Sequence, residues 1–207
     1  MIAAPHETPI PGPAQDLAQA IAARVPVLRT ERLVLRAPRL EDFPVYAAIL
    51  TGPRAEPMGE VLTRADAWDD WCRLVSLWLL RGHGIWTLET QAGETAGFVL
   101  IGFEPGDLEP ELGWFLSDAH EGQGLAQEAA QAVLAHAWGP LRLTTLVSYV
   151  APDNARSRAL ARRLGAEPVA SHDGCEVWRH HPTGAPRAPR HATSPANPPA
   201  TTARRPA

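Results

Sequence analysis

The sequence contains no lysine: all 19 of its basic residues are arginine. Without lysine no Schiff base can form, which excludes pyridoxal-phosphate chemistry and lysine-dependent aldol chemistry. Cysteine is also scarce, with only Cys72 and Cys175, and this indicates a reduced compartment without a disulfide framework. The N-terminus lacks a basic segment followed by an apolar core, and no apolar run approaches the length of a membrane span. We therefore expect a cytoplasmic protein without a membrane partner.

Charge is unevenly distributed along the 207 residues. Residues 183–207 hold four arginines and no acidic residue, whereas residues 1–182 hold 15 arginines against 23 acidic residues. An acidic domain is a poor candidate for binding nucleic acid. Its field instead favours, weakly, a cationic small molecule or a peptide amine.

Composition divides the chain into three parts. Residues 1–27 are rich in proline and alanine and predict an N-terminal extension with one short helix, over 15–24. Residues 28–181 have the patterning of one folded domain. Residues 182–207 are dominated by proline, alanine, threonine and arginine, and predict a disordered tail that cannot bury enough apolar surface to fold.

Hydrophobic periodicity predicts alternating strands and helices within the domain. A helix between the strands that end near 116 and begin near 143 makes those two strands a parallel crossover, while short turns make the other neighbours antiparallel. The fold class is therefore α+β, a mixed and mostly antiparallel central sheet flanked by helices. The expected strands are 32–36, 85–89, 96–103, 111–116, 143–150 and 175–180, and the expected helices are 40–50, 63–80, 126–138 and 154–164.

A glycine-punctuated turn, residues 121–126, begins the helix that follows strand 111–116. Gly122 and Gly124 let the backbone turn sharply and approach a ligand, and the first helical turn leaves amide groups unpaired at a positive helix end. Such a site suits a phosphate or pyrophosphate. A P-loop requires a lysine, and a dinucleotide fingerprint requires a third glycine in a doubly wound sheet, so the pyrophosphate of coenzyme A fits better.

Four stretches, in this order and spacing, give residues 28–180 a resemblance to the GNAT superfamily of acetyl-CoA-dependent N-acetyltransferases. The chain looks most like the branch of the ribosomal-protein alanine acetyltransferases. The stretches are LRTERLVLR at 28–36, ELGWFL at 111–116, EGQGLAQEA at 121–129, and NARS at 154–157 followed by LGA at 164–166.

The resemblance implies transfer of an acetyl group from the acetyl-CoA co-substrate to a primary amine, on a protein N-terminus or a small molecule, by direct attack on the thioester. A base must then take a proton from the amine. It implies Glu111 as that base, Ser157 as the partner of the leaving sulfur, and strand amides near Trp114 and Phe115 for the oxyanion. The coenzyme would be bound by Trp114, Phe115, Leu116, Glu121, Gly122, Gln123, Gly124, Leu125, Ala126 and Asn154.

Two positions depart from the family pattern. Glu121 stands where arginine or glutamine is usual, which places a carboxylate near a pyrophosphate. Ala161 stands where many members have a tyrosine acid, so Ser157 is expected to assist the thiolate, with Tyr149 as a weaker candidate.

Simpler interpretations compete with these roles. Glu111 could be a surface residue of a strand edge. Asn154, which the resemblance implies as a partner of the pantetheine chain, could be a plain helix N-cap, and the two roles of Asn154 are compatible. A catalytically idle CoA-binding module and a transferase for longer acyl groups remain alternatives, the acceptor is open, and a homodimer is compatible with the sequence. We expect no metal site, since His83, His120 and His136 lack ligand spacing and are expected at the surface or in loops. Cys72 and the apolar positions Trp68, Trp71, Leu74, Val75 and Trp78 are expected in the core.

Overall fold

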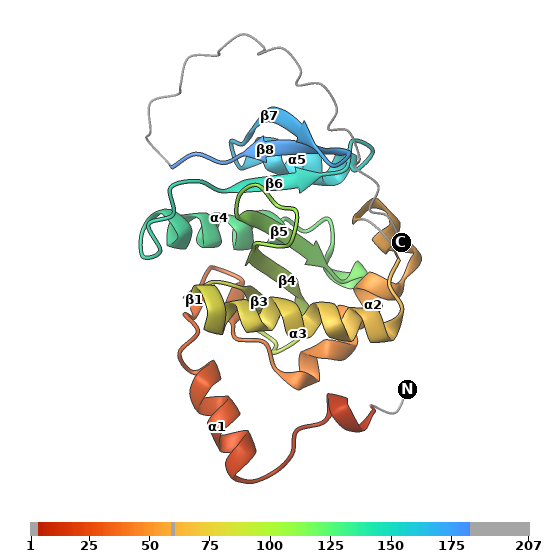
Figure 1. Cartoon of the computed structure of the whole chain (residues 1–207), viewed down its shortest axis with the longest axis vertical. Coiled ribbons are helices and arrows are strands. Elements are labelled where there is room, and N and C mark those ends of the chain that lie inside the picture. Colours follow the sequence, from red (N-terminus) through yellow and green to blue (C-terminus); the bar gives the residue numbers. More distant parts are fainter. Residues whose placement is uncertain (1–3, 59–60, 183–207) are drawn as a thin grey trace, which may run out of the picture.

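The computed structural model describes residues 4–58 and 61–182 and has an eight-stranded sheet (Figure 1). The strand order is β1-β2-β3-β4-β5-β6-β8-β7, and every neighbouring pair is antiparallel except β5–β6. The strands are β1 Leu28–Arg29, β2 Leu33–Arg36, β3 Ile85–Thr90, β4 Thr95–Gly102, β5 Glu111–Leu116, β6 Val147–Val150, β7 Glu167–His172 and β8 Cys175–Arg179. The α-helices are α1 Pro13–Ala22, α2 Phe43–Thr51, α3 Arg64–Arg81, α4 Leu125–Trp138 and α5 Ala155–Arg163, and short 3-10 turns are η1 Pro5–Glu7, η2 Leu40–Asp42, η3 Pro53–Met58 and η4 Asp118–His120. The predicted α+β class is confirmed.

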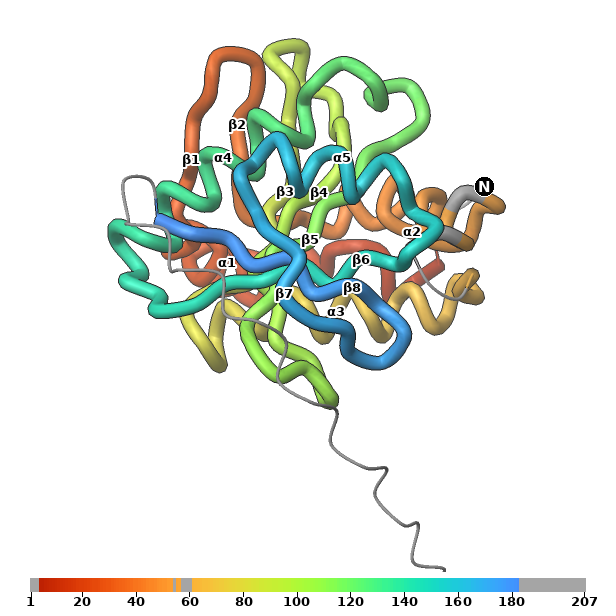
Figure 2. The backbone as a smooth tube through the Cα atoms, turned by 90° about the horizontal axis from the view of Figure 1, so that it is seen from above, coloured from red at the N-terminus to blue at the C-terminus, as the bar shows by residue number. Residues whose placement is uncertain are grey.

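Alternation along the strands builds a core on each face of the sheet. On β4, Val99 and Ile101 pack in the cluster that includes α4, while Phe98 and Leu100 pack with α2 and α3. Figure 2, which views the molecule from the β7 side, shows α4 and α5 on one side of the strands and α3 on the other. This packing leaves the start of α4 beside the end of β5, where the glycine turn lies.

The predicted limits of α3 are confirmed by its caps. The Thr63 side chain accepts a hydrogen bond from the Asp66 amide, and Gly82 ends the helix with φ 70°. On the face that packs inward, Trp71 and Leu74 are buried and Trp68, Val75 and Trp78 are partly buried. The predicted core role of this stripe is confirmed.

Asp42 ties α2 to the sheet from a buried position. Its carboxylate accepts two hydrogen bonds from Arg36, at 2.7 and 2.9 Å, and one each from the hydroxyls of Thr87 and Thr95. Burial raises the pKa of Asp42, but these hydrogen bonds and the Arg36 charge outweigh it and hold the pKa below its usual value. Because a charge buried with one partner removed is costly, this cluster fixes where α2 stands.

Three strands differ from the sequence prediction. The two-residue strand β1 was not predicted, since the first expected strand began at Arg32. The strand expected over 143–150 is shorter, because the Leu143 amide donates to Ala137 at the end of α4 and only Val147–Val150 joins the sheet. The strand β7 was not predicted, because it contains Pro168, shows little burial and lies at the sheet edge, where its register shifts between Pro168 and Ala170. The predicted loop over 54–60 contains the 3-10 turn η3, and its last two residues lie outside the described part, as does the tail from residue 183.

Three side chains lie elsewhere than predicted. Cys72 is exposed rather than in the core, because it lies about 100° around α3 from Trp71, on the stripe that includes exposed Asp69. His83 and His136 are buried rather than at the surface. His83 bonds the Ile101 carbonyl at 2.7 Å, and His136 packs edge-on against Trp86, so each serves the core.

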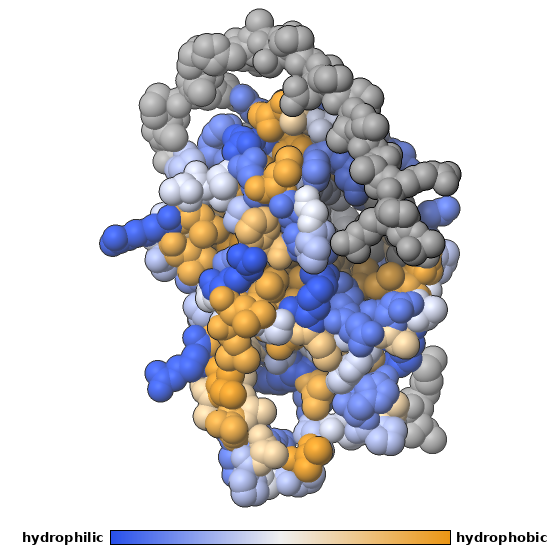
Figure 3. All heavy atoms as spheres, in the orientation of Figure 1, coloured by the Kyte–Doolittle hydropathy of each residue, from blue (hydrophilic) through white to orange (hydrophobic). Residues whose placement is uncertain are grey.

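Apolar side chains gather over α1 and the C-terminal part of α3 (Figure 3). Leu17, Leu79 and Leu80 are 63%, 71% and 76% exposed. None of the helices within 4–58 and 61–182 combines the length and apolar character needed to span a bilayer.

Candidate active site

The glycine turn at the start of α4 has the backbone of an anion site. Gly122 and Gly124 have φ angles of 72° and 79°, in the left-handed region that only glycine adopts without strain. The first amide bonded within α4 is that of Glu128, which donates to the Gly124 carbonyl at 3.1 Å. The amides of residues 125–127 therefore precede the helical hydrogen bonds, at the positive end of the helix. An anion placed here would meet several N–H donors at once.

Arg32, in the turn between β1 and β2, holds this loop in place. Its Nη1 donates to the Gln123 carbonyl at 2.9 Å, and its Nε donates to Glu128 at 2.7 Å. The Glu128 carboxylate also accepts the Arg32 amide at 2.8 Å. Since the Gln123 carbonyl is fixed by a side chain 91 positions away, the turn is preorganised rather than left to find its conformation on binding.

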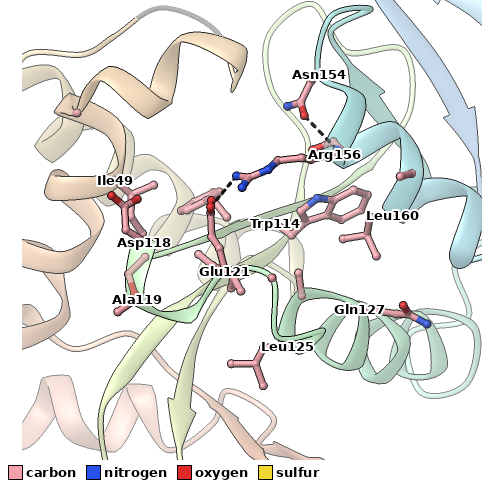
Figure 4. Close-up of a pocket in the computed structure, with 18 of the residues that line it drawn as sticks. Ile49, Trp114, Asp118, Ala119, Glu121, Leu125, Gln127, Asn154, Arg156 and Leu160 are labelled. Atoms are coloured by element: carbon pink, nitrogen blue, oxygen red, sulfur yellow. Dashed lines mark hydrogen bonds and ion pairs between the residues drawn. The ribbon is translucent and has the colours of Figure 1, made fainter.

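A large cavity of about 1650 Å³ begins at the glycine turn. Its walls are the end of β5, the start of α4, the start of α5 and part of α2. Figure 4 shows Arg156 reaching from α5 across the cavity to Glu121 in the turn, with 2.6 Å between Nη1 and Oε2. The carboxylate that departs from the family pattern is therefore balanced by an arginine of the same cavity.

A small cavity of about 270 Å³ adjoins the large one. Asp70, Glu104 and Glu111 supply its carboxylates, and most of the remaining wall is apolar. Both cavities are lined by Trp114, Phe115, Asn154 and Ser157. The candidate site therefore has one half with the backbone geometry of an anion site and one acidic half. They meet at these four side chains, which form the junction of the two cavities.

Glu111 has an unusual environment for a carboxyl group. Burial raises its pKa to about 8, and the negative charges of Asp107 and Glu104 act in the same direction. The Tyr149 amide, which donates to Glu111 Oε1 at 3.4 Å, and the Arg73 charge lower the pKa only in part. Arg73 is also engaged elsewhere, with Glu104 at 2.8 Å and with Asp70. A pKa near neutral pH is what a general base requires.

The amides of β5 alternate between its two neighbours. The Ser117 amide donates to the Ala96 carbonyl of β4. Phe115, two residues earlier, pairs with Phe98, so the Phe115 amide also faces β4. The Trp114 amide faces the β6 side, where the described residues pair only at Glu111 and Val147. Of the two amides expected near the acyl group, that of Phe115 therefore faces β4, whereas that of Trp114 faces the opening between β5 and β6.

Asn154 and Ser157 stand at the first turn of α5, beside the junction of the cavities. The Asn154 side chain accepts the Ser157 amide at 3.0 Å, so the expected N-cap is present. Tyr149 lies farther from the large cavity: its hydroxyl accepts the amides of Leu108 and Glu109 at 3.0 and 3.2 Å. The Tyr149 hydroxyl therefore hydrogen-bonds the backbone of the 105–110 loop rather than a group at the junction.

Several residues of the site were not predicted from the sequence. Arg32 and Arg156 act on the glycine turn from distant segments, and Asp70 and Glu104 add their charges from α3 and the loop after β4. Arg32 and Arg156 had a local signal, since they lie inside the LRTERLVLR and NARS stretches, whereas Asp70 and Glu104 lie outside all four stretches. Among the residues described, no three His, Cys, Asp or Glu side chains gather as metal ligands would.

A mixed sheet whose one parallel pair opens beside a glycine turn defines the acetyltransferase class, and comparison with known proteins agrees. The model of the acetyltransferase (GNAT) domain matches residues 32–167. The chain belongs to the GNAT acetyltransferase family.

Individual relatives support this assignment. An uncharacterised N-acetyltransferase, p20 of Bacillus licheniformis, is 30% identical over 144 residues, which cover 66% of this chain and 80% of that protein. The crystal structure of an acetyltransferase from Agrobacterium tumefaciens is 39% identical with a TM-score of 0.73, over 76% of this chain and 95% of that one. RimL, a ribosomal L7/L12 α-N-protein acetyltransferase solved with coenzyme A, shares the fold at 19% identity and a TM-score of 0.60, over 75% and 97% of the two chains.

Proposed function

We propose that this protein transfers the acetyl group of acetyl-CoA to a primary amine, on a protein N-terminus or a small molecule. The observation that carries the proposal is the meeting of the two cavities at Trp114, Phe115, Asn154 and Ser157. One cavity begins at a preorganised anion site, and the other contains a carboxylate whose pKa is raised to about 8. RimL with coenzyme A shows that the fold accommodates this coenzyme in another protein.

The residues at hand fit the coenzyme. The amides of 125–127 and the Arg156 guanidinium offer donors and positive charge to a pyrophosphate. Leu116 and the end of β5 line the cavity between that turn and the junction. The Gln123 side chain is outside this lining and donates to the Ala119 carbonyl at 2.8 Å. In this proposal the coenzyme contacts Trp114, Phe115, Leu116, residues 121–126 and Asn154.

Each chemical step has a group to perform it. An amine is mostly protonated at neutral pH, so the Glu111 carboxylate accepts its proton, directly or through water. The amine nitrogen attacks the carbonyl carbon of the thioester, and the Trp114 amide stabilises the oxyanion that forms. The nitrogen then loses its second proton to solvent, and the carbon–sulfur bond breaks while the Ser157 hydroxyl donates a hydrogen bond to the departing thiolate. The thiolate takes a proton from solvent, which gives the amide product and the CoA thiol.

The charge of the small cavity favours a cationic acceptor. Asp70, Glu104 and Glu111 line it, and Arg73 is the cation paired with the first two of them. Binding of an ammonium ion would favour the ionised form of Glu111 and so prepare the base. The same field would disfavour acceptors with a carboxylate next to the amine.

The experiment is a panel of amines and peptides offered with acetyl-CoA, scored by free thiol release and by the mass of the product. We expect one N-acetylated amine for each CoA released, and a loss of about 10²–10⁴-fold in turnover for Glu111→Gln. Acetyl-CoA binding in that variant should change little. Thermal stabilisation by acetyl-CoA without thiol release on any amine would instead support an idle CoA-binding module. Longer acyl-CoA donors in the same panel test which acyl group is transferred. Sedimentation tests whether the protein forms a homodimer. A cytoplasmic location stays an expectation.

A further inference from the structure

The parallel pairing of β5 and β6 is interrupted by side chains that take the places of backbone partners. The Val147 amide donates to the Pro110 carbonyl at 3.0 Å, as in a parallel ladder. In a continued ladder the next donor would be the Tyr149 amide and its acceptor the Leu112 carbonyl. Instead, Ser148 Oγ donates to the Leu112 carbonyl at 2.6 Å, and the Tyr149 amide turns to Glu111 Oε1 at 3.4 Å. The backbone hydrogen bonds between β5 and β6 stop here because the Ser148 hydroxyl bonds the next acceptor and the Glu111 carboxylate bonds the next donor.

His180 supports the Ser148 hydroxyl from β8's end. Its Nε2 lies 2.9 Å from Ser148 Oγ, and both residues are almost fully buried, at 3% and 2% exposure. A serine hydroxyl has one proton, and here it goes to the Leu112 carbonyl, so His180 Nε2 carries the proton of this second hydrogen bond. Burial, and the neighbouring His181 to a smaller extent, lower the His180 pKa to about 4, which keeps the ring neutral at physiological pH.

The interrupted rung determines what is exposed beyond it. The rung after it would join the Trp114 amide to the Tyr149 carbonyl. The described strands do not pair there, and Ser148, Leu112, Tyr149 and Trp114 all line the small cavity where the strands diverge. Figure 1 shows β6 turning away from β5 toward β8 and β7.

We propose that Ser148 and His180 are positioning residues that hold β5 and β6 apart, so that the Trp114 amide remains available to the acyl carbonyl and the Tyr149 amide remains bonded to Glu111. The inference rests on the proposed function. Loss of the Ser148 hydroxyl would let the Tyr149 amide and the Leu112 carbonyl pair with each other. The next rung would then capture the Trp114 amide, and Glu111 would lose a donor.

This arrangement has a signature in the pH profile. Glu111 is faced by Asp107 and Glu104 from the loop after β4, Arg73 from α3, the Tyr149 amide from β6 and Cys175 from β8. The amide and Arg73 lower the pKa of Glu111, whereas the acids raise it. Removing the amide hydrogen bond therefore raises that pKa further, and the acidic limb of activity moves to higher pH.

The test compares Ser148→Ala with Ser148→Thr, and His180→Leu with His180→Gln. Thr keeps a hydroxyl, and Gln keeps a donor at a reach similar to Nε2. We expect the Ala and Leu variants to lower kcat about ten- to hundredfold, to move the acidic limb upward and to leave acetyl-CoA affinity within about twofold. The Thr and Gln variants should recover most of kcat. Wild-type kcat and pH profile in both Ser148→Ala and His180→Leu would overturn the proposal.

Amide hydrogen exchange tests the same inference on the unmodified chain. The Trp114 amide should exchange much faster than the laddered amides of β5 and slow down when acetyl-CoA is added. Full protection of the Trp114 amide in the free protein would contradict the proposal, even if the variants fail to fold. If the wild type acetylates no amine, the proposed function fails, while the exchange rates still decide whether the strands are held apart.

Discussion

Replacing Glu111 with glutamine should raise the stability of the protein in a pH-dependent way. The pKa of this carboxyl is raised by burial from its ordinary value of 4.5 to about 8. Between those values the folded chain holds a proton that the unfolded chain has released, so the free energy of unfolding falls as the pH rises. The slope is about 1.4 kcal/mol per pH unit, which sets an upper bound of about 5 kcal/mol over the window.

Glutamine is neutral at every pH, so the free energy of unfolding of Glu111→Gln does not fall in this way as the pH rises. We expect its advantage over the wild type to be near zero at pH 4.5, to grow through neutral pH and to level off above pH 8, at about 2–4 kcal/mol after solvent relaxation is allowed for. Urea unfolding at a series of pH values measures this difference. A difference that stays constant with pH would refute the raised pKa.

Glu109→Gln is the matched control two positions away. The hydrogen bond from Arg179 lowers the pKa of Glu109, so this carboxylate stabilises the fold above its unfolded pKa and the stabilisation is lost as the pH falls. Its replacement should therefore have the opposite sign at neutral pH. In kinetics, kcat/KM of the wild type should rise toward pH 8 as Glu111 ionises. Glu109→Gln should keep this limb, and Glu111→Gln should lose it together with most of the turnover.

Three further predictions concern binding and stability. Glu121→Gln should bind acetyl-CoA about two- to fivefold more tightly in calorimetry at low salt, because it frees Arg156 for the pyrophosphate; weaker binding would contradict a phosphate at this turn. Gly124→Glu should abolish acetyl-CoA binding, whereas Gly93→Glu, which imposes a comparable positive-φ strain in a distant hairpin, should not; equal loss in both would indicate general strain. Asp42→Asn should lower the free energy of unfolding by about 3 kcal/mol, because it removes one of the two carboxylates that pair with buried Arg36 and leaves Glu89 as the other; a change below about 1 kcal/mol in urea unfolding would remove Asp42 as the anchor of α2.

Much of the fold could be predicted because local signals agree with it. The cap pair at Thr63 and Gly82, the glycine turn before α4 and the Asn154 cap each place an element boundary by backbone chemistry alone. Edge strand β7 and the shortened β6 could not be predicted, since pairing with β8 and competition from the end of α4 decide them.

The candidate site likewise contains parts that local sequence signals predict and parts that depend on long-range contacts. The glycine turn and Glu111 are visible in sequence because a backbone conformation and a residue type define them. The charges around Glu111, the Arg156–Glu121 ion pair and the Ser148–His180 pair depend on side chains brought together from distant segments. No periodicity records such contacts.

The most direct test of direct transfer across the junction of the two cavities is a single-turnover reaction of acetyl-CoA with an accepted amine, followed by rapid quenching and mass spectrometry of protein and product. The acetyl group should appear on the amine at the rate at which thiol is released, and intact protein should carry no acetyl group at any time, including on Cys175. Acetylated protein that forms before the product, or thiol release without acetylated amine, would contradict the account.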